Sequence, residues 1–403
     1  MTALADGLIL RPARPNDLDQ IGALLTARGD AADAEDHALV MADPNGGWES
    51  CAVVTDGARI VSTLTLFDEE LRMAVPGTDA VLALPAGQVE LVATDSQYEG
   101  RGLVRALMAW GHARSVRRGH VVQVMVGIPY FYRLFGYSYA IDVQPDRSVP
   151  VPPPVADGHT VRAAGADDLP ALAALQETAQ AVADVRMPHS AACWRWLHAR
   201  SASELWAVER DGRIVATGRT YPPDDGGELS EVAAVDVTAA AALVAHCVSR
   251  LGGEPLAVAD RPGTPVAALL DEIGQPPPRE LQRYYVRIPD VTQLFDLLRL
   301  VLDARLAAFD GEVPDEIVLS FFGSHLRLPV NGRQIGRPVP GGTMQAPYSA
   351  GGAGIAPDAL PEVLFGPDGI TGLRRPDVYP GPHREPMAAL FPPQTADVLT
   401  FYR

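Results

Sequence analysis

Two glycines, Gly100 and Gly102, stand in a Q-x-x-G-x-G loop that begins at Gln97. The apolar, β-branched run at residues 89–93 predicts a buried strand before the loop, and apolar residues at helical spacing over residues 103–118 predict a helix after it. Glycines let a backbone approach a ligand closely, and the free N–H groups at the start of a helix point toward an anion. The stretch therefore predicts a phosphate cradle, although it matches neither the dinucleotide pattern G-x-G-x-x-G nor the nucleoside-triphosphate pattern G-x-x-x-x-G-K-[ST].

A tyrosine-rich segment follows one predicted strand later. Residues 120–127 form another apolar run, and residues 128–137 contain the pattern Y-x-x-x-G-Y from Tyr132 to Tyr137. Gly136 suits the position just beyond a helix, so we expect a two-turn helix here. The glycine loop and this helix, in this order, resemble the acetyl-CoA pyrophosphate loop and the last core helix of GNAT acyltransferases.

The composition describes a large, acidic, globular chain. Its 403 residues are enough for two or three domains, and 47% apolar with 21% charged residues is typical of a globular protein. The net charge of −17 disfavours nucleic-acid and anionic-membrane partners and is compatible with a cationic substrate. No apolar run is long enough to span a membrane, and residues 1–15 lack the pattern of a secretion signal, so we expect a cytoplasmic protein with reduced cysteines.

The elements that must position the loop belong to the first of three predicted domains. This domain covers residues 1–145 and includes an acidic loop at residues 29–37 and a hairpin that turns at Asp56 and Gly57. A proline-rich linker at residues 146–157 is the clearest domain boundary.

Residues 158–288 repeat sequence patterns of the first domain. Residues 161–175 align without gaps on residues 10–24, and a second match follows in the hairpin, which together suggest a duplicated domain. Where the glycine loop is due, residues 235–243 are rich in alanine and lack the backbone freedom of a phosphate-binding loop. We therefore expect a GNAT-like domain that binds no CoA.

The last predicted domain, residues 289–403, begins with an amphipathic helix and two strands, and the short helix expected at residues 357–366 resembles that of a sterol-carrier-protein fold. The predicted fold class is α/β (α+β), with tandem GNAT folds and a sterol-carrier-protein-like C-terminal domain. This plan resembles the Eis (enhanced intracellular survival) family of N-acetyltransferases. The resemblance implies acetyl-CoA as cofactor, a small-molecule amine such as an aminoglycoside, a polyamine or a lysine side chain as substrate, and a homo-oligomer, commonly a hexamer.

Carried over by position, the resemblance places the cofactor on three segments. It implies that the backbone of Val92, Ala93 and Thr94 pairs with pantetheine, and that Gly127 and Ile128 flank the cofactor on the next strand. The pyrophosphate is expected at the loop and the helix start, formed by Gly100, Arg101, Gly102, Leu103, Val104 and Arg105.

Acetyl transfer requires a placed neutral amine, hydrogen-bond donors for an oxyanion and a proton for the departing thiolate. Tyr132 matches the general-acid tyrosine of the family, and a phenol of pKa ~10 can protonate a thiolate whose conjugate acid lies near ~8.5. The backbone N–H of Val92 or Ala93 is the candidate oxyanion donor. Glu90 lies on the same strand and is either a base or a solvated or substrate-orienting carboxylate.

Acidic residues and the chain end are further candidates. Asp30, Asp33 and Asp36 are candidates to attract a cationic amine, the alternative being a solvated acidic loop. The resemblance implies that the C-terminal carboxylate of Arg403 enters the active site, although the family usually ends on an aromatic residue and most chain ends fray. Glu99 stands where family members often have a basic residue, which we expect to weaken phosphate attraction.

The function predicted from these residues is N-acetyltransfer from acetyl-CoA to a primary amine of a small cationic molecule, by direct attack through a tetrahedral intermediate. The alternative is a non-catalytic acyl-CoA-binding or ligand-sensing protein with an apolar ligand in its C-terminal domain. No metal-binding or serine-hydrolase motif is present, so no metal is expected.

Overall fold

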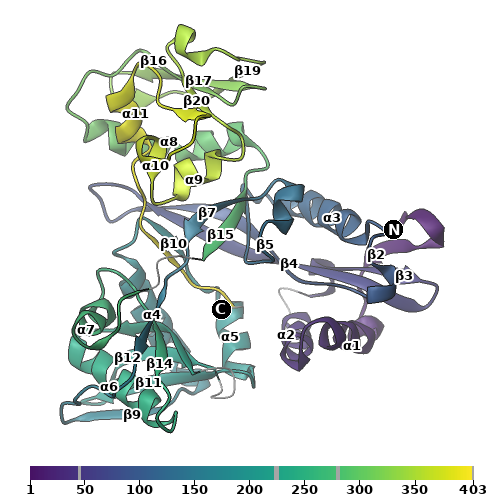
Figure 1. Ribbon diagram of the computed structural model, residues 1–403, viewed down its shortest axis with the longest axis vertical. Coiled ribbons are helices and arrows are strands. Elements are labelled where there is room, and N and C mark those ends of the chain that lie inside the picture. Colours follow the sequence, from purple (N-terminus) through teal and green to yellow (C-terminus); the bar gives the residue numbers. More distant parts are fainter. Residues whose placement is uncertain (44–46, 222–226, 278–281, 402–403) are drawn as a thin grey trace.

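The computed structural model describes residues 1–43, 47–221, 227–277 and 282–401. Its strands form three sheets in three parts of the molecule (Figure 1). The first sheet crosses the middle of the view, with the second below it and the third above it. The prediction of a mixed α/β chain with several sheets is confirmed.

The first sheet has ten strands and leads into the glycine loop. Its main path is β1 (Thr2–Ala3), β2 (Ile9–Pro12), β3 (Cys51–Asp56), β4 (Arg59–Ala74), β5 (Val81–Thr94), β6 (Val122–Met125), β15 (Arg283–Arg287) and β7 (Ser138–Asp142). Two more strands, β10 (Val185–Met187) and β22 (Ala396–Val398), extend it beside β4. β5 and β6 are parallel, whereas β4 and β5 form a long antiparallel pair.

Helices cover both faces of this sheet. They are α1 (Leu18–Arg28), α2 (Ala31–Ala42) and α3 (Leu103–Arg117). Leu107 of α3 packs with Leu64 of β4 in one buried cluster, and Ile21 of α1 packs with Phe67 of β4 in another. Because residues 64 and 67 face opposite sides of the strand, α3 and α1 lie on opposite faces of the sheet.

The acidic loop predicted at residues 29–37 is wrong, since α2 occupies most of it. Asp30 is the N-cap of α2, and its carboxylate accepts a hydrogen bond from the backbone N–H of Asp33 at 3.1 Å. Asp36 and His37 are buried. Acidic side chains favour the start of a helix as well as a solvated loop, and here the helix is formed.

The two-turn helix predicted at residues 128–137 is a shorter 3-10 helix, η5 (Phe131–Phe135). It starts late because Tyr130 adopts a left-handed backbone with φ of +65°, and it ends as predicted at Gly136, with φ of +83°. Other 3-10 helices are η1 (Ala5–Gly7), η2 (Pro15–Asp17), η3 (Trp48–Ser50), η4 (Ser96–Tyr98), η6 (Ala166–Asp168) and η8 (Pro347–Ala350).

The second sheet repeats the plan of the first. Its order is β8 (Asp146–Val149), β14 (Leu256–Ala259), β13 (Glu228–Ala234), β12 (Arg213–Thr220), β11 (Glu204–Arg210) and β9 (His159–Ala163). The helices of this part are α4 (Leu169–Gln180), α5 (Ala191–Ala199), α6 (Val237–Ser249) and α7 (Pro265–Ile273).

Two segments cross the predicted domain boundaries. The proposed linker at residues 146–157 begins with β8, which pairs with β14 and is therefore part of the second sheet. β15 falls within the predicted second domain but inserts between β6 and β7 of the first sheet. Both pairings join residues far apart in sequence, so neither leaves a local signal in the chain.

The third sheet consists of β18 (Gln334–Ile335), β17 (His325–Asn331), β16 (Glu316–Ser320), β20 (Ala353–Ile355) and β21 (Val378–Tyr379), with β19 (Val339–Gly341) beside β17. Its helices are α8 (Val291–Ala307), α9 (Leu360–Phe365), α10 (Gly369–Gly372) and α11 (Arg384–Leu390). Phe295 and Leu302 of α8 share one buried cluster with Leu84 of β5, so the third part packs directly on the first sheet. Among the described helices, none combines the length and apolarity that crossing a bilayer requires.

Candidate functional site

A β-bulge distorts β5 just before the glycine loop. In the pairing with β4, the two residues Leu91 and Val92 lie opposite the single residue Leu64. Leu91 has a φ of +51°, a backbone conformation that residues other than glycine rarely adopt. The neighbouring strand β6 pairs with β5 only over residues 86–88, and beyond that point the two strands diverge. The bulge therefore faces an opening between two parallel strands.

Two glycines shape the turn that follows. Gly100 has a φ of +74°, and Gly102, the N-cap residue of α3, has a φ of +77°. Only glycine adopts this backbone without appreciable strain. No side chain among the described residues caps the first turn of α3, so its N–H groups stay free to bind an anion. The loop has the backbone geometry of a phosphate cradle.

The bulge, the loop and η5 enclose a cavity of about 570 Å³, here called the cofactor groove. The predicted cofactor residues that line it are Val92, Ala93, Thr94, Gly100, Gly102, Leu103, Val104, Arg105 and Ile128. A second cavity of about 220 Å³, here called the acceptor cavity, is lined by Glu90, Asp33 and Gly127 among others. Val92, Ala93, Ile128 and Tyr132 line both cavities, which therefore meet at the bulge.

Tyr132 stands where the two cavities meet. Its ring packs edge-on against Tyr285 and lies beside Phe135, and the residue is only 7% exposed. Burial, reinforced by the charge of Glu90, raises the pKa of the Tyr132 phenol to about 12. The phenol is therefore protonated at neutral pH and can donate a hydrogen bond into the site.

Gly127 provides the space that the Tyr132 ring occupies. A Cβ atom at residue 127 would lie 2.3 Å from Cε2 of Tyr132, which is far inside van der Waals contact. Any larger residue at this position would displace the ring. Gly127, which was predicted to flank the cofactor, therefore also leaves the space that the Tyr132 ring needs.

Glu90 extends into the acceptor cavity from β5. Burial raises the pKa of its carboxyl to about 8, with further contributions from the nearby Glu69 and Asp33. A hydrogen bond of 2.6 Å from the Gln88 amide opposes this shift. Burial also raises the pKa of Glu69 to about 8. A carboxyl with a pKa near 8 can accept a proton at close to neutral pH, which an ordinary surface glutamate does poorly.

Three predicted residues lie away from both cavities. Arg101 stacks over the ring of Tyr98 at 4.6 Å and does not line the groove. Asp30 caps α2, and Asp36 is fully buried in an ion pair of 2.8 Å with Arg200. Of the three aspartates proposed to attract an amine, only Asp33 reaches the acceptor cavity.

Two residues that contribute to the site carried no signal in the sequence. Arg28, at the end of α1, lines both cavities and forms an ion pair with Glu99 of the glycine loop. This pair neutralises the carboxylate that we expected to weaken phosphate attraction. Glu69 was missed because it lies on a strand distant in sequence from the motif. Arg403, whose carboxylate was predicted to act here, lies outside the described residues.

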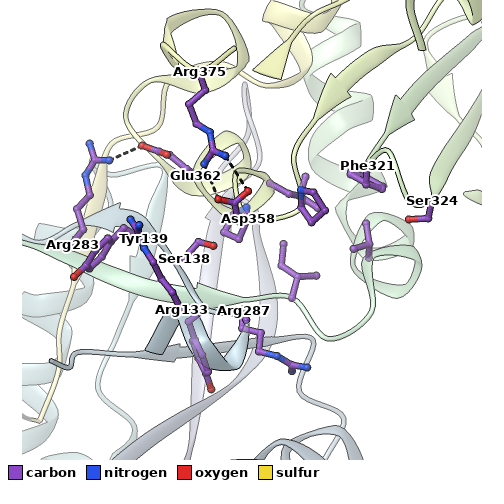
Figure 2. A pocket seen from close by; sticks show the side chains of 17 residues that line it. Arg133, Ser138, Tyr139, Arg283, Arg287, Phe321, Ser324, Asp358, Glu362 and Arg375 are labelled. Atoms are coloured by element: carbon purple, nitrogen blue, oxygen red, sulfur yellow. Dashed lines mark hydrogen bonds and ion pairs between the residues drawn. The ribbon is translucent and has the colours of Figure 1, made fainter. Parts of the chain in front are cut away.

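A further cavity of about 620 Å³ lies between the edge of the first sheet and α9, and shares no lining residue with the groove or the acceptor cavity. Figure 2 shows Arg283 directed toward Glu362, and Arg375 directed toward Asp358. Arg283 thus joins the first and third parts of the chain through its ion pair with Glu362, and Arg375 pairs with Asp358 within the third part. None of the described residues that the sequence predicted to carry chemistry lines this cavity.

Comparisons with known proteins agree with this geometry. The family model described as "Acetyltransferase (GNAT) domain" matches residues 10–140. A GCN5-related N-acetyltransferase from Anabaena variabilis ATCC 29413 has a similar structure, with a TM-score of 0.69, 14% identity, and coverage of 97% of this chain and 99% of that one. One from Kribbella flavida has a TM-score of 0.67 and 16% identity, and covers 98% of each chain.

Eis1 from Mycobacterium abscessus is also similar, with a TM-score of 0.60, 17% identity, and coverage of 97% of this chain and 99% of that one. At these identities the likeness concerns the fold. No curated protein sequence matches the chain. The family match covers the bulge, the glycine loop and Tyr132. Residues 10–140 therefore match the GNAT acetyltransferase domain, a family whose acetyl donor is acetyl-CoA.

Proposed function

We propose that the protein transfers the acetyl group of acetyl-CoA to a primary amine of a small cationic molecule. The observation that carries this proposal is the meeting of the cofactor groove and the acceptor cavity at the bulge, with Tyr132 lining both and Glu90 on the acceptor side. A donor and an acceptor bound on the two sides would meet where these side chains and the bulge backbone lie. Such placement is a large part of catalysis for a transfer between two bound molecules.

The roles follow from the chemistry of each group. Acetyl-CoA supplies the acetyl group as a thioester. The backbone N–H of Val92 or Ala93 is proposed to donate to the developing oxyanion. Tyr132 is proposed to donate a hydrogen bond to the departing sulfur. Its pKa of about 12 lies above the ~8.5 of a thiol, so the phenol stabilises the thiolate, and full protonation is completed by solvent.

The acceptor side favours a cationic amine. Glu69, Glu90 and Asp33 interact electrostatically around it, and burial raises the pKa of each carboxyl. A bound ammonium group would offset the desolvation of these carboxylates and their mutual repulsion, and would thereby favour their ionised forms. Glu90 is then proposed to take the proton that the amine must lose before it attacks.

By resemblance to the Eis family we also propose an Eis-like choice of substrates, a sterol-carrier-like C-terminal part, a homo-oligomer of hexameric form and a role for the Arg403 carboxylate in placing the amine. The cytoplasmic location expected from the sequence is likewise a proposal. The whole-chain similarity to Eis1 from Mycobacterium abscessus supports the first of these.

A thiol-release screen tests the proposed activity. Acetyl-CoA would be incubated with the protein and with polyamines, aminoglycosides, lysine peptides, and neutral alcohols of similar size as controls. We expect release of free CoA that depends on a cationic amine. Binding of acetyl-CoA without release in the presence of any amine would instead favour a ligand-sensing protein.

The rate should depend on pH through Glu90. Because the pKa of this carboxyl is raised to about 8, its basic form grows as pH rises, and kcat/KM should increase up to about pH 8 and then level off. Glu90→Gln should remove this inflection. Amines of different pKa provide the control, since an inflection that follows the pKa of the amine would show that the substrate, and not Glu90, is titrating.

The raised pKa of Glu90 also makes the stability of the fold depend on pH, in the opposite direction to a carboxylate whose pKa is lowered. The stabilising contribution of protonated Glu90 is complete below its unfolded pKa near 4.5 and is lost as pH rises toward about 8. Glu90→Gln should therefore be the more stable protein above pH 8, as measured by thermal unfolding.

A further inference from the structure

The second domain keeps the distorted strand of the cofactor site. In the pairing of β13 with β12, Glu231 and Val232 lie opposite the single residue Gly218, as Leu91 and Val92 lie opposite one residue in the first sheet. Glu231 has a φ of +57°, close to the +51° of Leu91. β13 and its parallel neighbour β14 pair only at residues 228–229 before they diverge. The opening that holds the cofactor in the first domain thus has a counterpart here.

Side chains of the second domain fill the opening between β13 and β14. Arg261 comes two residues after β14, in the stretch that corresponds to Gly127 and Ile128 of the first domain, and is 1% exposed. Its guanidinium donates to the backbone carbonyl of Val232 at 3.0 Å and to the Gln176 side chain at 2.6 Å. The Gln176 amide donates in turn to the carbonyl of Glu231. The carbonyl groups of both bulge residues therefore have hydrogen-bond partners within the protein.

One acetyl-CoA should therefore bind per chain. Besides the filled opening, the start of α6 carries Ala239 and Ala240, both buried, in place of a glycine loop. Calorimetric titration should give a stoichiometry of one. A stoichiometry of two would show that the second domain binds the cofactor despite its occupied opening.

The C-terminal segment docks on the residues that fill the opening. Asp397 of β22 forms a buried ion pair of 2.8 Å with Arg261. Arg219, which is fully buried and paired with Glu231 at 2.7 Å, donates to the carbonyl oxygens of Thr400 at 3.1 Å and Phe401 at 3.5 Å. Buried guanidinium groups are costly unless fully partnered, and here the segment supplies part of the partners.

Aromatic contacts complete this docking. The Phe401 ring lies edge-on to Trp196 at 5.9 Å between centroids, and Arg200 stacks over it at 5.0 Å. Phe401 is 2% exposed. In Figure 1 the yellow C-terminal segment runs from the third part of the molecule, past β10, to the space between the first and second parts.

We propose that the second domain binds residues 395–401 of its own chain at the filled opening that corresponds to the cofactor opening of the first domain. In this proposal Arg219 and Arg261 are positioning residues for the acceptor side of the catalytic site. The connection runs through Thr400. The Gln88 amide donates to the Thr400 hydroxyl at 3.3 Å and to Glu90 at 2.6 Å. The docked segment thereby sets the orientation of Gln88, and Gln88 sets that of Glu90.

A double-mutant cycle tests this arrangement on the full chain. Arg219→Gln should release the segment, which hydrogen exchange would report as faster exchange of the amides in residues 396–401. With the proposed acetyl transfer as readout, the amine kcat/KM should fall about 10-fold to 100-fold, as for a misplaced catalytic group, while the KM for acetyl-CoA stays unchanged. In a chain truncated after Val398, Arg219→Gln should have no further effect on the amine kcat/KM.

Arg210→Gln is the matched control, because Arg210 pairs with Asp236 in the same domain without touching the segment. It should change neither the exchange nor the kinetics. Equal losses from Arg219→Gln in the full and truncated chains, or unchanged exchange at residues 396–401, would overturn the proposal.

Thr400→Val covers the case in which Arg219→Gln does not fold. It removes the hydroxyl and leaves the second domain intact, and it should lower the amine kcat/KM without changing the KM for acetyl-CoA. Unchanged kinetics would refute the connection through Gln88. If no amine is acetylated at all, the proposed function fails, whereas the hydrogen-exchange measurement still decides whether the second domain holds the segment.

Discussion

Gly102→Asp should weaken acetyl-CoA binding by roughly 100-fold or more, which is about 3 kcal/mol. Gly102 has a φ of +77°, and an L-residue in this conformation is strained by about 1–2 kcal/mol. Its added carboxylate would also lie at the uncapped start of α3, in a groove proposed to hold phosphates. Like charges and a loop driven from its conformation both oppose binding. Isothermal titration calorimetry with acetyl-CoA measures the effect.

Gly119→Asp is the control for strain and charge. Gly119 follows the other end of α3, has a φ of +79°, and would also place its Cβ in open space. The Gly119→Asp variant should bind acetyl-CoA like the unmodified protein, while losing about as much stability as Gly102→Asp. Should both variants lose affinity equally, or should Gly102→Asp fold and bind normally, the loop is not the phosphate site.

Tyr132→Phe should fold normally and lose kcat by ~10²–10⁴-fold, the usual effect of removing a group that assists proton transfer. The ring keeps its packing beside Tyr285 and its place against Gly127, so affinity for acetyl-CoA should change little. The loss should therefore appear in kcat and not in the affinity for the cofactor, as expected for an interaction made in the transition state.

Tyr137→Phe is a suitable comparison, since Tyr137 belongs to the same buried aromatic cluster but directs its hydroxyl to His112 at 3.2 Å. It should keep a kcat close to that of the unmodified protein. If Tyr132→Phe retained kcat within a few-fold, the hydrogen bond to the departing sulfur would have to come from another residue.

The cofactor half of the site could be predicted because its parts are consecutive in sequence. The strand, the two glycines and α3 depend on local rules of periodicity, glycine conformation and helix termination, and the structure forms them at the expected residues. The bulge could not be predicted, since Leu91 is an ordinary strand residue whose φ of +51° arises from the pairing with β4.

The acceptor half depends on contacts between distant segments. Arg28, Glu69 and Thr400 reach the region of the bulge from a helix, a long strand and the chain end, and no spacing in the sequence connects them. The same reason explains why β15 falls within the predicted second domain although it pairs in the first sheet. At α2 the local signals conflicted, because aspartates suit both a solvated loop and a helix start.

The proposed acetyl transfer is tested most directly by following the acetyl group itself. Isotopically labelled acetyl-CoA would be incubated with the best amine from the thiol-release screen, and the products would be analysed by mass spectrometry for the unmodified protein and for Gly102→Asp. We expect labelled N-acetyl amine equal in amount to the CoA released, and no product above background with Gly102→Asp. CoA release without an acetylated amine, or equal product from both proteins, would contradict it.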